Sequence, residues 1–361
     1  MKQIPKLLSV VLLLLIAACS GVGPLGKKSA RQSHVAAFRT DPRLKLWNSE
    51  YLQARSGGVT VALPYAEAGK FGVEPSALAY DIQLKQGELV TLSIEAQGAV
   101  FSEISLGGDV LAESDSTGHL FLTAPKSGAF KLVVQPGLET VGKFLLKVER
   151  DASLGFPVAG KGNASIQSFW ADVRDGGQRR HEGIDIFAKR GTPVVAVADG
   201  FVSFTGDRGL GGKQVWQRLG LFGHSVYYAH LDKIAVESGR RVRAGDTLGF
   251  VGNSGNASGT APHLHFGIYT SSGAVDPLPF VYRHHKIANS RIPQAPEALR
   301  IKVATSAANL RISPDGSAAV VTKAPRNALY NVMGRSLDWL HVRAADGARG
   351  FIHRSVTTAV N

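Results

Sequence analysis

The sequence predicts an all-β protein with several domains. Short runs of alternating apolar and polar residues recur along the chain, as in Val90/Leu92/Ile94 and in residues 144–148. This period of two is typical of strands that bury one face. The 41 glycines separate many of these runs and favour tight turns. A length of 361 residues exceeds one ordinary domain, and 44% apolar residues can supply several cores.

The first residues have the features of an export signal. Lys2 and Lys6 precede an apolar run, residues 7–18, which is shorter than the roughly 20 residues that cross a bilayer. The run ends at Cys19, the one cysteine of the sequence. This ending resembles the lipobox of bacterial lipoproteins. It implies removal of residues 1–18 and attachment of lipid to Cys19; an ordinary signal with an incidental cysteine is the alternative.

Lipidation at Cys19 implies a membrane anchor, since more than one acyl chain suffices for stable attachment. By the same resemblance, Ser20 implies sorting to an outer membrane, with the protein facing the periplasm. A single cysteine leaves no intramolecular disulfide, even after export. Residues 19–57 are predicted to form a lipid-anchored tether, because their first half is small, basic and unpatterned, with a short helix over residues 43–55.

The charge of the chain limits the classes of partner that we expect. The formal net charge is +13, but the basic residues are not interleaved with aromatic ones as in nucleic-acid modules. We therefore expect no nucleic-acid partner. An acidic polymer or an anionic membrane surface fits the charge, and solubility alone remains the alternative. The sequence leaves open whether a protein regulates it.

Residues 58–150 are predicted to form a β-sandwich accessory domain. Glycine-containing turns interrupt its short apolar runs, for example at Gly87, Gly98, Gly118 and Gly128. Strands at this spacing are typical of sandwiches. The segment has no grouping of acidic residues with histidines, so we expect a binding or spacer role.

Residues 155–283 form a second glycine-rich β segment, and it contains the chemistry-bearing residues. His263 and His265 stand at positions i and i+2 of a strand-like run, so both imidazoles share one face. Leu264 and Phe266 then point the other way, into a core. This arrangement suggests that one imidazole binds a metal while the other works beside it.

A carboxylate accompanies these histidines. His181 and Asp185 are four residues apart around Gly183. Imidazole and carboxylate ligands with one open position suit Zn²⁺ in hydrolytic sites. The His-Glu-x-x-His motif of helical zinc peptidases is absent, so Glu182 has no assigned role.

Three separated motifs resemble those of the lysostaphin-type (LytM-like) zinc metalloendopeptidases. They are His181-x-x-x-Asp185, the segment 228–231 that contains His230, and His263-Leu264-His265. The same family is indicated by a glycine-containing segment that follows the first motif and by others that lie between the second and third motifs. The resemblance covers residues 155–283 and implies antiparallel sheets that form a groove over one Zn²⁺ ion.

The resemblance also implies roles for individual residues. His181, Asp185 and His265 are expected to bind the metal. His230 and His263 are expected to be catalytic, assisting the attack of metal-activated water and stabilising the oxyanion. The implied substrate is peptidoglycan.

Two features depart from the family pattern or lie beside it. The hairpin region 209–228 is longer than usual, which leaves substrate fit open, and His224 within it is either a groove residue or a turn histidine. Arg174, Arg179 and Arg180 precede the first motif. They are candidates for pairing with substrate carboxylates, and an exposed basic loop is the alternative.

The last part of the chain is a predicted linker, residues 284–299, followed by a small domain over residues 300–361. This domain resembles bacterial SH3-type domains through residues 309–311, Trp339 and residues 350–352, together with Pro314 and Val320-Val321. The resemblance implies an SH3-like barrel that binds cell-wall peptide. Trp339 and Phe351 either offer apolar contact surface or form the barrel core.

The sequence thus predicts a peptidoglycan endopeptidase that cuts stem-peptide cross-links. By resemblance, the bond that is cut is expected to be D-Ala–diaminopimelate rather than a bond of pentaglycine. The alternatives are an inactive wall-binding scaffold or activator of a murein amidase, and a peptidase of ordinary proteins. A further hypothesis is that the N-terminal β domain covers the groove.

Overall fold

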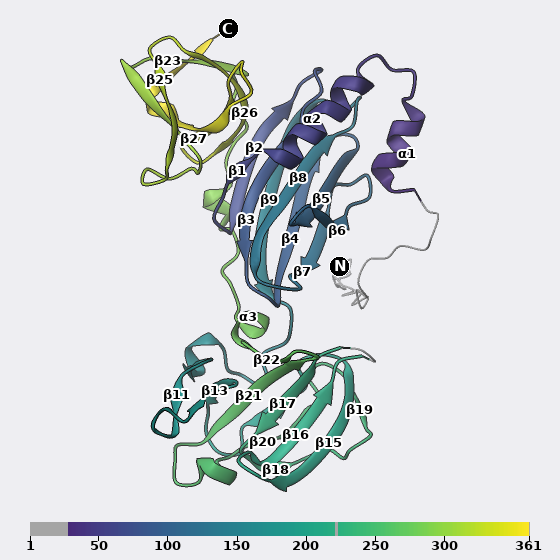
Figure 1. The fold of residues 1–361 in the computed structure, drawn as a ribbon, viewed down its shortest axis with the longest axis vertical. Coiled ribbons are helices and arrows are strands. Elements are labelled where there is room, and N and C mark those ends of the chain that lie inside the picture. The colour runs from purple at the N-terminus through teal and green to yellow at the C-terminus, as the bar shows by residue number, and fades with distance from the viewer. Residues whose placement is uncertain (1–27, 221–222, 361) are drawn as a thin grey trace, which may run out of the picture.

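The computed structural model describes residues 28–220 and 223–360. They form an N-terminal sandwich, a central domain and a C-terminal barrel, all rich in strands (Figure 1). Cys19 and the predicted signal peptide lie outside the described residues. Within the described ranges, no helix has the length and apolar character needed to cross a membrane.

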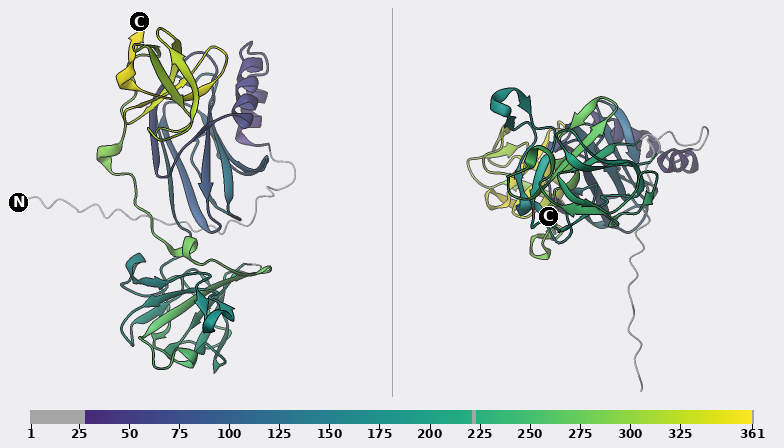
Figure 2. Two further views of the ribbon diagram at one scale, coloured as in Figure 1. Left: turned by 60° about the vertical axis from the view of Figure 1, so that its left-hand side comes forward. Right: turned by 90° about the horizontal axis from the view of Figure 1, so that it is seen from below.

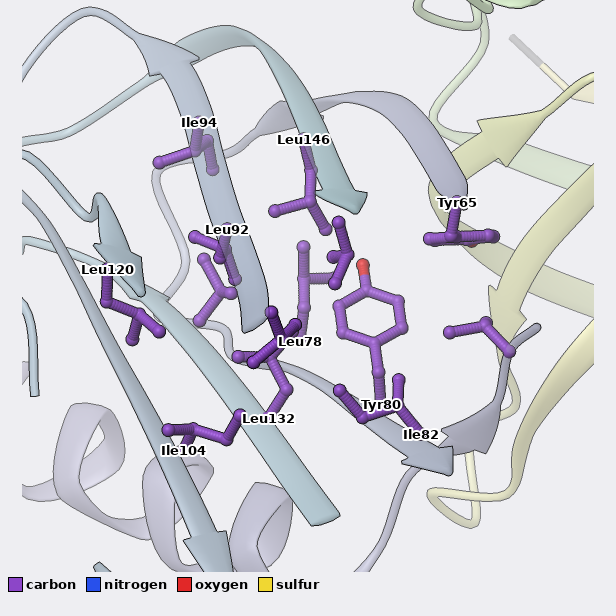
Figure 3. Packing of buried hydrophobic residues seen from close by; sticks show 14 of the residues in the cluster. Tyr65, Leu78, Tyr80, Ile82, Leu92, Ile94, Ile104, Leu120, Leu132 and Leu146 are labelled. Atoms are coloured by element: carbon purple, nitrogen blue, oxygen red, sulfur yellow. The ribbon is translucent and has the colours of Figure 1, made fainter. Parts of the chain in front are cut away.

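The N-terminal sandwich consists of two facing sheets. One has the order β1-β3-β8-β5-β6, and the other contributes β2-β9-β4-β7. The side chains between the sheets form one core that includes Leu92, Ile94, Leu132 and Leu146 (Figure 3). The alternation of buried and exposed residues along β4 agrees with the period of two in the sequence. The strands of the first sheet are β1 (Val59–Thr60), β3 (Leu78–Leu84), β8 (Gly128–Pro136), β5 (Val100–Leu106) and β6 (Asp109–Glu113). Those of the second are β2 (Tyr65–Phe71), β9 (Gly142–Ala152), β4 (Glu88–Ala96) and β7 (Leu120–Thr123).

Two helices lie against the outer face of the first sheet: α1 (Ala30–Ala37) and α2 (Leu44–Ser56). Trp47 of α2 is buried and donates its indole N–H to the carbonyl of Pro136 at 2.7 Å. Ala54 packs on residues of β3 and β8. The helix expected near residues 43–55 is present. The tether prediction is wrong for residues 28–57, because these long-range contacts order a segment with little local pattern of its own.

The central domain is built around one antiparallel sheet with the order β10-β13-β21-β17-β16-β15-β19, to which β22 adds beside β21. A second sheet, β14-β20-β18, packs on it, and β11 and β12 form a separate two-stranded ribbon. Val194, Tyr228, Leu264 and Phe266 belong to the shared core. The main-sheet strands are β10 (Ile166–Ser168), β13 (Ile184–Phe187), β21 (His263–Thr270), β17 (Ser225–Ala229), β16 (Gly212–Arg218), β15 (Gly200–Arg208), β19 (Arg241–Val242) and β22 (Gly273–Val275). The others are β14 (Pro193–Val195), β20 (Thr247–Val251), β18 (Leu231–Ile234), β11 (Val173–Arg174), β12 (Arg179–Arg180) and the short helix α3 (Leu278–Val281).

The C-terminal barrel continues the second sheet of the sandwich. Its strand β26 pairs with β2 through Ala68 and Arg335, which extends the order to β25-β24-β28-β27-β26-β2-β9-β4-β7. Figure 2 shows the barrel beside the sandwich and away from the central domain. The barrel strands are β23 (Arg300–Val303), β24 (Ala307–Arg311), β25 (Val320–Pro325), β26 (Leu329–Ser336), β27 (Trp339–Arg343), β28 (Arg349–His353) and β29 (Thr357–Val360).

The aromatic residues of the barrel take part in this docking. Phe351 is fully buried within the sandwich core, and Trp339 packs against the same cluster. Phe351 therefore lies neither on an apolar contact surface nor in the core of the barrel, the two positions considered from the sequence. The barrel has its own core without it, around Leu310, Val342 and Ile352.

A buried polar cluster fixes the same interface. The carboxylate of Glu67 on β2 is fully buried and accepts hydrogen bonds from Tyr65, Tyr80 and the Nδ1–H of His341 on β27, the last at 3.0 Å. Leaving such a carboxylate without its partners in an apolar setting is costly. The linker also lies on the sandwich, since the amide of Ile287 donates to Glu149 at 2.9 Å.

His341→Ala should therefore loosen the sandwich and the barrel together. Leaving a buried hydrogen-bonding group without its partner costs about 1–3 kcal/mol, and more for a charged group. We expect the melting transition shared by the two domains to move to lower temperature in scanning calorimetry of the full-length protein. His285→Ala, at an exposed linker histidine, is the control. An unchanged melting profile for His341→Ala would show that the barrel does not depend on this contact.

Candidate metal centre and groove

The candidate metal centre is built on the pairing of β13 with β21. These antiparallel strands place Asp185 directly opposite His265, and Phe187 opposite His263. Ile184, Ile186, Leu264 and Phe266 point to the other face and are fully buried. The alternation that the sequence indicated at residues 263–266 is thus present, and both histidines lie on the groove face.

Three donor atoms converge beside these strands. The Nε2 atom of His181 lies 3.1 Å from Oδ1 of Asp185 and 3.0 Å from Nδ1 of His265, and the last two atoms are 3.1 Å apart. The structure therefore brings together the three residues predicted as metal ligands. His181 and Asp185 are buried, and the side chain of His265 is 14% exposed.

The orientation of His181 leaves its Nε2 atom free for a cation. Its Nδ1 lies 2.8 Å from the carbonyl oxygen of Phe169, which can only accept, so the Nδ1 proton is committed there. In the neutral ring, Nε2 then presents a lone pair to the carboxylate oxygen of Asp185. Two electron-rich atoms at 3 Å repel one another unless a proton or a cation lies between them.

The donor set fits zinc in both chemistry and size. Zn²⁺ takes imidazole nitrogen and carboxylate oxygen at about 2.0–2.1 Å, and tetrahedral geometry at this bond length separates ligand atoms by about 3.3 Å. The observed separations of 3.0–3.1 Å are close to this value. Gly183 makes the approach possible, because a Cβ atom there would lie 2.6 Å from the ring of His265.

Arg174 supports the carboxylate of Asp185 from behind. Its guanidinium contacts Oδ2 of Asp185 at 2.9 Å and the hydroxyl of Ser168. Burial alone would raise the pKa of Asp185, but its contacts with His181 and His265 outweigh burial and hold that pKa far below its ordinary value. Asp185 is therefore ionised, with Oδ1 directed to the two imidazoles.

His230 and His263 form a second pair beside the three donors. Their rings lie 5.1 Å apart, and the ring of His230 is 5.8 Å from that of His265. The Nδ1 atom of His230 donates to the carbonyl of Ser254 at 2.9 Å, and Nδ1 of His263 donates to the carbonyl of Ala261 at 2.8 Å. Each ring thus keeps its Nε2 for chemistry in the groove.

The backbone at His230 is unusual. This residue follows β17 directly and has a φ of 62°, in the left-handed region that is rare for residues other than glycine. Such conformations cluster at functional sites. Burial, reinforced by the neighbouring His265 and His263, lowers the pKa of His230 to about 4. Its imidazole is therefore neutral near pH 7 and able to accept a proton.

The centre opens into a groove of about 610 Å³. All the groove-lining residues belong to the central domain, between positions 168 and 269. No described residue of the N-terminal sandwich contributes to it. The structure thus does not support the hypothesis that the sandwich covers the groove.

The other residues singled out in the sequence have different positions. Arg179 and Arg180 line the groove with Arg174. His224 precedes the start of β17, while His230 follows the end of that strand, and the ring of His224 packs edge-on against Phe280 at 5.5 Å. It does not line the groove and corresponds to the turn histidine.

An aromatic cluster on the groove face was not anticipated. Trp216 and Tyr227 are paired across β16 and β17 and their rings lie 4.5 Å apart. Tyr269 lies 5.1 Å from Trp216, and the ring of Tyr227 is 5.7 Å from His265. Their spacing in the sequence carries no signal, because the sheet register alone brings them together. The region 209–228 contains β16 and the start of β17, and Leu210 in its first turn lines the groove.

Comparison with known proteins agrees with this site. Residues 179–277 match peptidase family M23, and residues 304–358 match the bacterial SH3 domain family. The first match contains the three candidate ligands together with His230 and His263.

Similar curated proteins include two peptidases. The chain is 38% identical over 136 residues to an L-Ala–D-Glu endopeptidase of Bacillus subtilis, covering 34% of this chain and 41% of that protein. It is 41% identical over 100 residues to the DD-carboxypeptidase/endopeptidase Mpg of Neisseria meningitidis, covering 28% and 22%. The chain thus spans less than half of the length of these relatives.

Among solved structures, the catalytic domain of the antimicrobial peptidase lysostaphin from Staphylococcus simulans is 35% identical. The match covers 32% of this chain and 89% of that domain, with a TM-score of 0.29. The resemblance expected from the three motifs is confirmed: the central domain of this chain is a peptidase family M23 domain, and the barrel that follows it is a bacterial SH3 domain.

Proposed function

We propose that this protein is a zinc-dependent endopeptidase that hydrolyses peptide bonds of peptidoglycan, within the cross-linked stem peptides. The observation that carries the proposal is the convergence of Nε2 of His181, Oδ1 of Asp185 and Nδ1 of His265 at 3.0–3.1 Å in an open groove. Two further histidines stand beside them. The site thus offers candidate metal ligands and candidate proton-transfer groups.

The three donors would hold one Zn²⁺ ion. When bound, zinc supplies a Lewis acid that polarises a carbonyl and lowers the pKa of water. The side chains around the three donors keep them in place: the carbonyl of Phe169 orients His181, and Arg174 orients Asp185. Partners of this kind typically contribute 10–100-fold to metal affinity.

His230 and His263 would move protons in the groove. A neutral imidazole with its Nδ1–H bound to a carbonyl can accept a proton at Nε2 from the attacking water. Once protonated, the same atom can donate to the developing oxyanion or to the leaving amine. The lowered pKa of His230 keeps its imidazole in the accepting form at the start of the reaction.

The relatives favour a wall peptide as substrate. One relative is named for the L-Ala–D-Glu bond, and the other is named a DD-carboxypeptidase/endopeptidase. A D-Ala–diaminopimelate cross-link is the bond we propose, and a glycyl-glycine bridge is the alternative. The protein would be exported and anchored to the outer membrane by lipid on Cys19, with its groove in the periplasm.

A catalytically inactive scaffold or amidase activator is less consistent with the site. Such a protein needs neither the ligand set nor the helper histidines. Here the three candidate ligands and the two helper histidines lie together. The backbone of His230 adopts a rarely populated conformation at this site. A metal-binding measurement separates the two functions.

Full-length protein should bind one zinc ion per chain. Asp185→Ala and His265→Ala should weaken this binding by more than the 10–100-fold typical of an outer partner, because each removes a ligand atom. Isothermal titration against a competing chelator gives the affinity. Glu182→Gln, a neighbouring carboxylate that does not join the three donors, is the matched control and should bind normally. Equal affinity in all four proteins would place the metal elsewhere.

Digestion of purified peptidoglycan tests the reaction itself. We expect the wild-type protein to release muropeptides cut within their cross-links, identified by mass. His230→Ala should retain zinc but lose about 10²–10⁴-fold in kcat, the usual contribution of a general acid–base group. His224→Ala, which alters a histidine outside the groove, should remain active. Release of intact stem peptides from the glycan, or no release at all, would contradict the proposal.

A further inference from the structure

The groove face of the main sheet presents its side chains in rows that cross the strands. The first row contains Asp185 and His265, which are paired between β13 and β21. In the second row, Tyr227 of β17 is paired with Trp216 of β16 and with Gly267 of β21. Successive rows are two residues apart along each strand, or about 6–7 Å. The two aromatic residues of the second row therefore lie next to the candidate metal ligands, on the same face.

The third row adds another ring and leads into a second hollow. Tyr269 of β21 is paired with Ser225 of β17, which is paired with Arg218 of β16. The rings of Tyr269 and Trp216 lie 5.1 Å apart, so the second and third rows share one aromatic cluster. Tyr269 lines both the groove and a further hollow of about 340 Å³. The lining of this hollow also includes Arg218, Ser225 and Thr270. Aromatic rings thus lie between the candidate metal ligands and a polar hollow.

The three rings of this cluster present part of their surface to the groove. Trp216, Tyr227 and Tyr269 are each half-buried, and all of them line the groove. Gly267 allows the ring of Tyr269 to lie close over β21, because a Cβ atom there would approach that ring to 3.1 Å. The rings offer a broad apolar surface, and the two phenol hydroxyl groups give it a polar edge. Such a surface suits a ligand that has a flat apolar face and polar groups around it.

We infer that the cluster of Trp216, Tyr227 and Tyr269 binds a sugar ring of the glycan strand to which the stem peptide is attached. This inference rests on the proposed endopeptidase function and adds a second part to its substrate. The C–H groups on one face of a pyranose ring stack on the electron-rich face of an aromatic ring. The hydroxyl and acetamido groups of the sugar can bind polar side chains at the edge. Alanine, glutamate and diaminopimelate, the residues of the stem, have no comparable flat face.

The distances along the sheet fit this ligand. In a cross-link between D-Ala and diaminopimelate, D-Ala is the fourth residue of a stem that starts at the sugar. Four extended residues span about 13 Å, and two row spacings from the candidate metal ligands also amount to about 13 Å. With the scissile bond at the metal ligands, an extended stem would bring its sugar to the third row, at Tyr269 and the polar hollow.

Two forms of one cross-linked peptide test the inference. One form retains the N-acetylglucosamine–N-acetylmuramic acid disaccharide on the stem that contributes D-Ala to the cross-link, and the other has no sugar. We expect the wild-type protein to cleave the sugar-bearing form with about tenfold higher kcat/KM, the order contributed by one stacked ring. The preference should persist at high salt, because stacking of a neutral sugar involves no pair of charges that salt could screen. Equal kcat/KM for the two forms would overturn the inference.

Trp216→Leu and Tyr269→Leu should each remove most of this preference, because they lower kcat/KM for the sugar-bearing form more than for the sugar-free form. Trp216→Phe keeps a ring and should keep most of the preference. Tyr282→Leu is the matched control, since this exposed tyrosine lies outside the groove lining. Zinc affinity equal to that of the wild type would show that a variant retains the folded groove. A full preference in both leucine variants, or an equal loss for the two peptide forms, would contradict the inference.

Binding of the disaccharide alone distinguishes this inference from the proposed function, because it requires neither a peptide nor turnover. Titration of the disaccharide into the full-length protein should shift the NMR signal of the Trp216 indole N–H, which is assigned by its loss in Trp216→Leu. A shift of this signal would support the sugar site even in a protein that cleaves no peptide. An unchanged signal at millimolar disaccharide would refute the site, whatever the catalytic activity.

Discussion

The antiparallel register of β13 and β21 is the constraint on which the site depends. It places Asp185 opposite His265 while Ile184, Ile186, Leu264 and Phe266 are buried behind them. Because side chains alternate between the faces of a sheet, a slip of one residue would turn the ligands into the core and the apolar residues into the groove. The burial of those four side chains therefore stabilises the register that the chemistry needs.

The surrounding chain contributes orientation. Carbonyl groups of Phe169, Ser254 and Ala261 each accept the Nδ1 proton of one histidine. These carbonyls belong to loops whose positions depend on the two packed sheets of the central domain. The left-handed backbone at His230 also contributes to the orientation of the histidines. His230 directly follows β17, and this conformation turns its imidazole toward His263.

The sequence was sufficient for the local parts of the site. Spacing within the strand placed His263 and His265 on one face, and the resemblance joined them to His181, Asp185 and His230. It was insufficient wherever a residue's position depends on a distant segment. The role of Arg174 behind Asp185, the aromatic cluster around Trp216 and the position of His224 all follow from sheet register and loop packing.

The same distinction applies to the fold. Alternating runs predicted the all-β domains correctly, because the period of two is a local signal. Helix α1, the packing of residues 28–57 on the sandwich and the docking of the barrel were missed, since they depend on contacts with residues far along the chain, such as Trp47 with Pro136 and Glu67 with His341. The barrel is consequently an extension of the sandwich.

Anomalous X-ray scattering at the zinc edge, from crystals of the zinc-loaded full-length protein, tests the central claim most directly. The account predicts a single strong peak within about 2.0–2.2 Å of His181 Nε2, Asp185 Oδ1 and His265 Nδ1. A peak at other side chains, or none at these three atoms in a fully loaded protein, would contradict it.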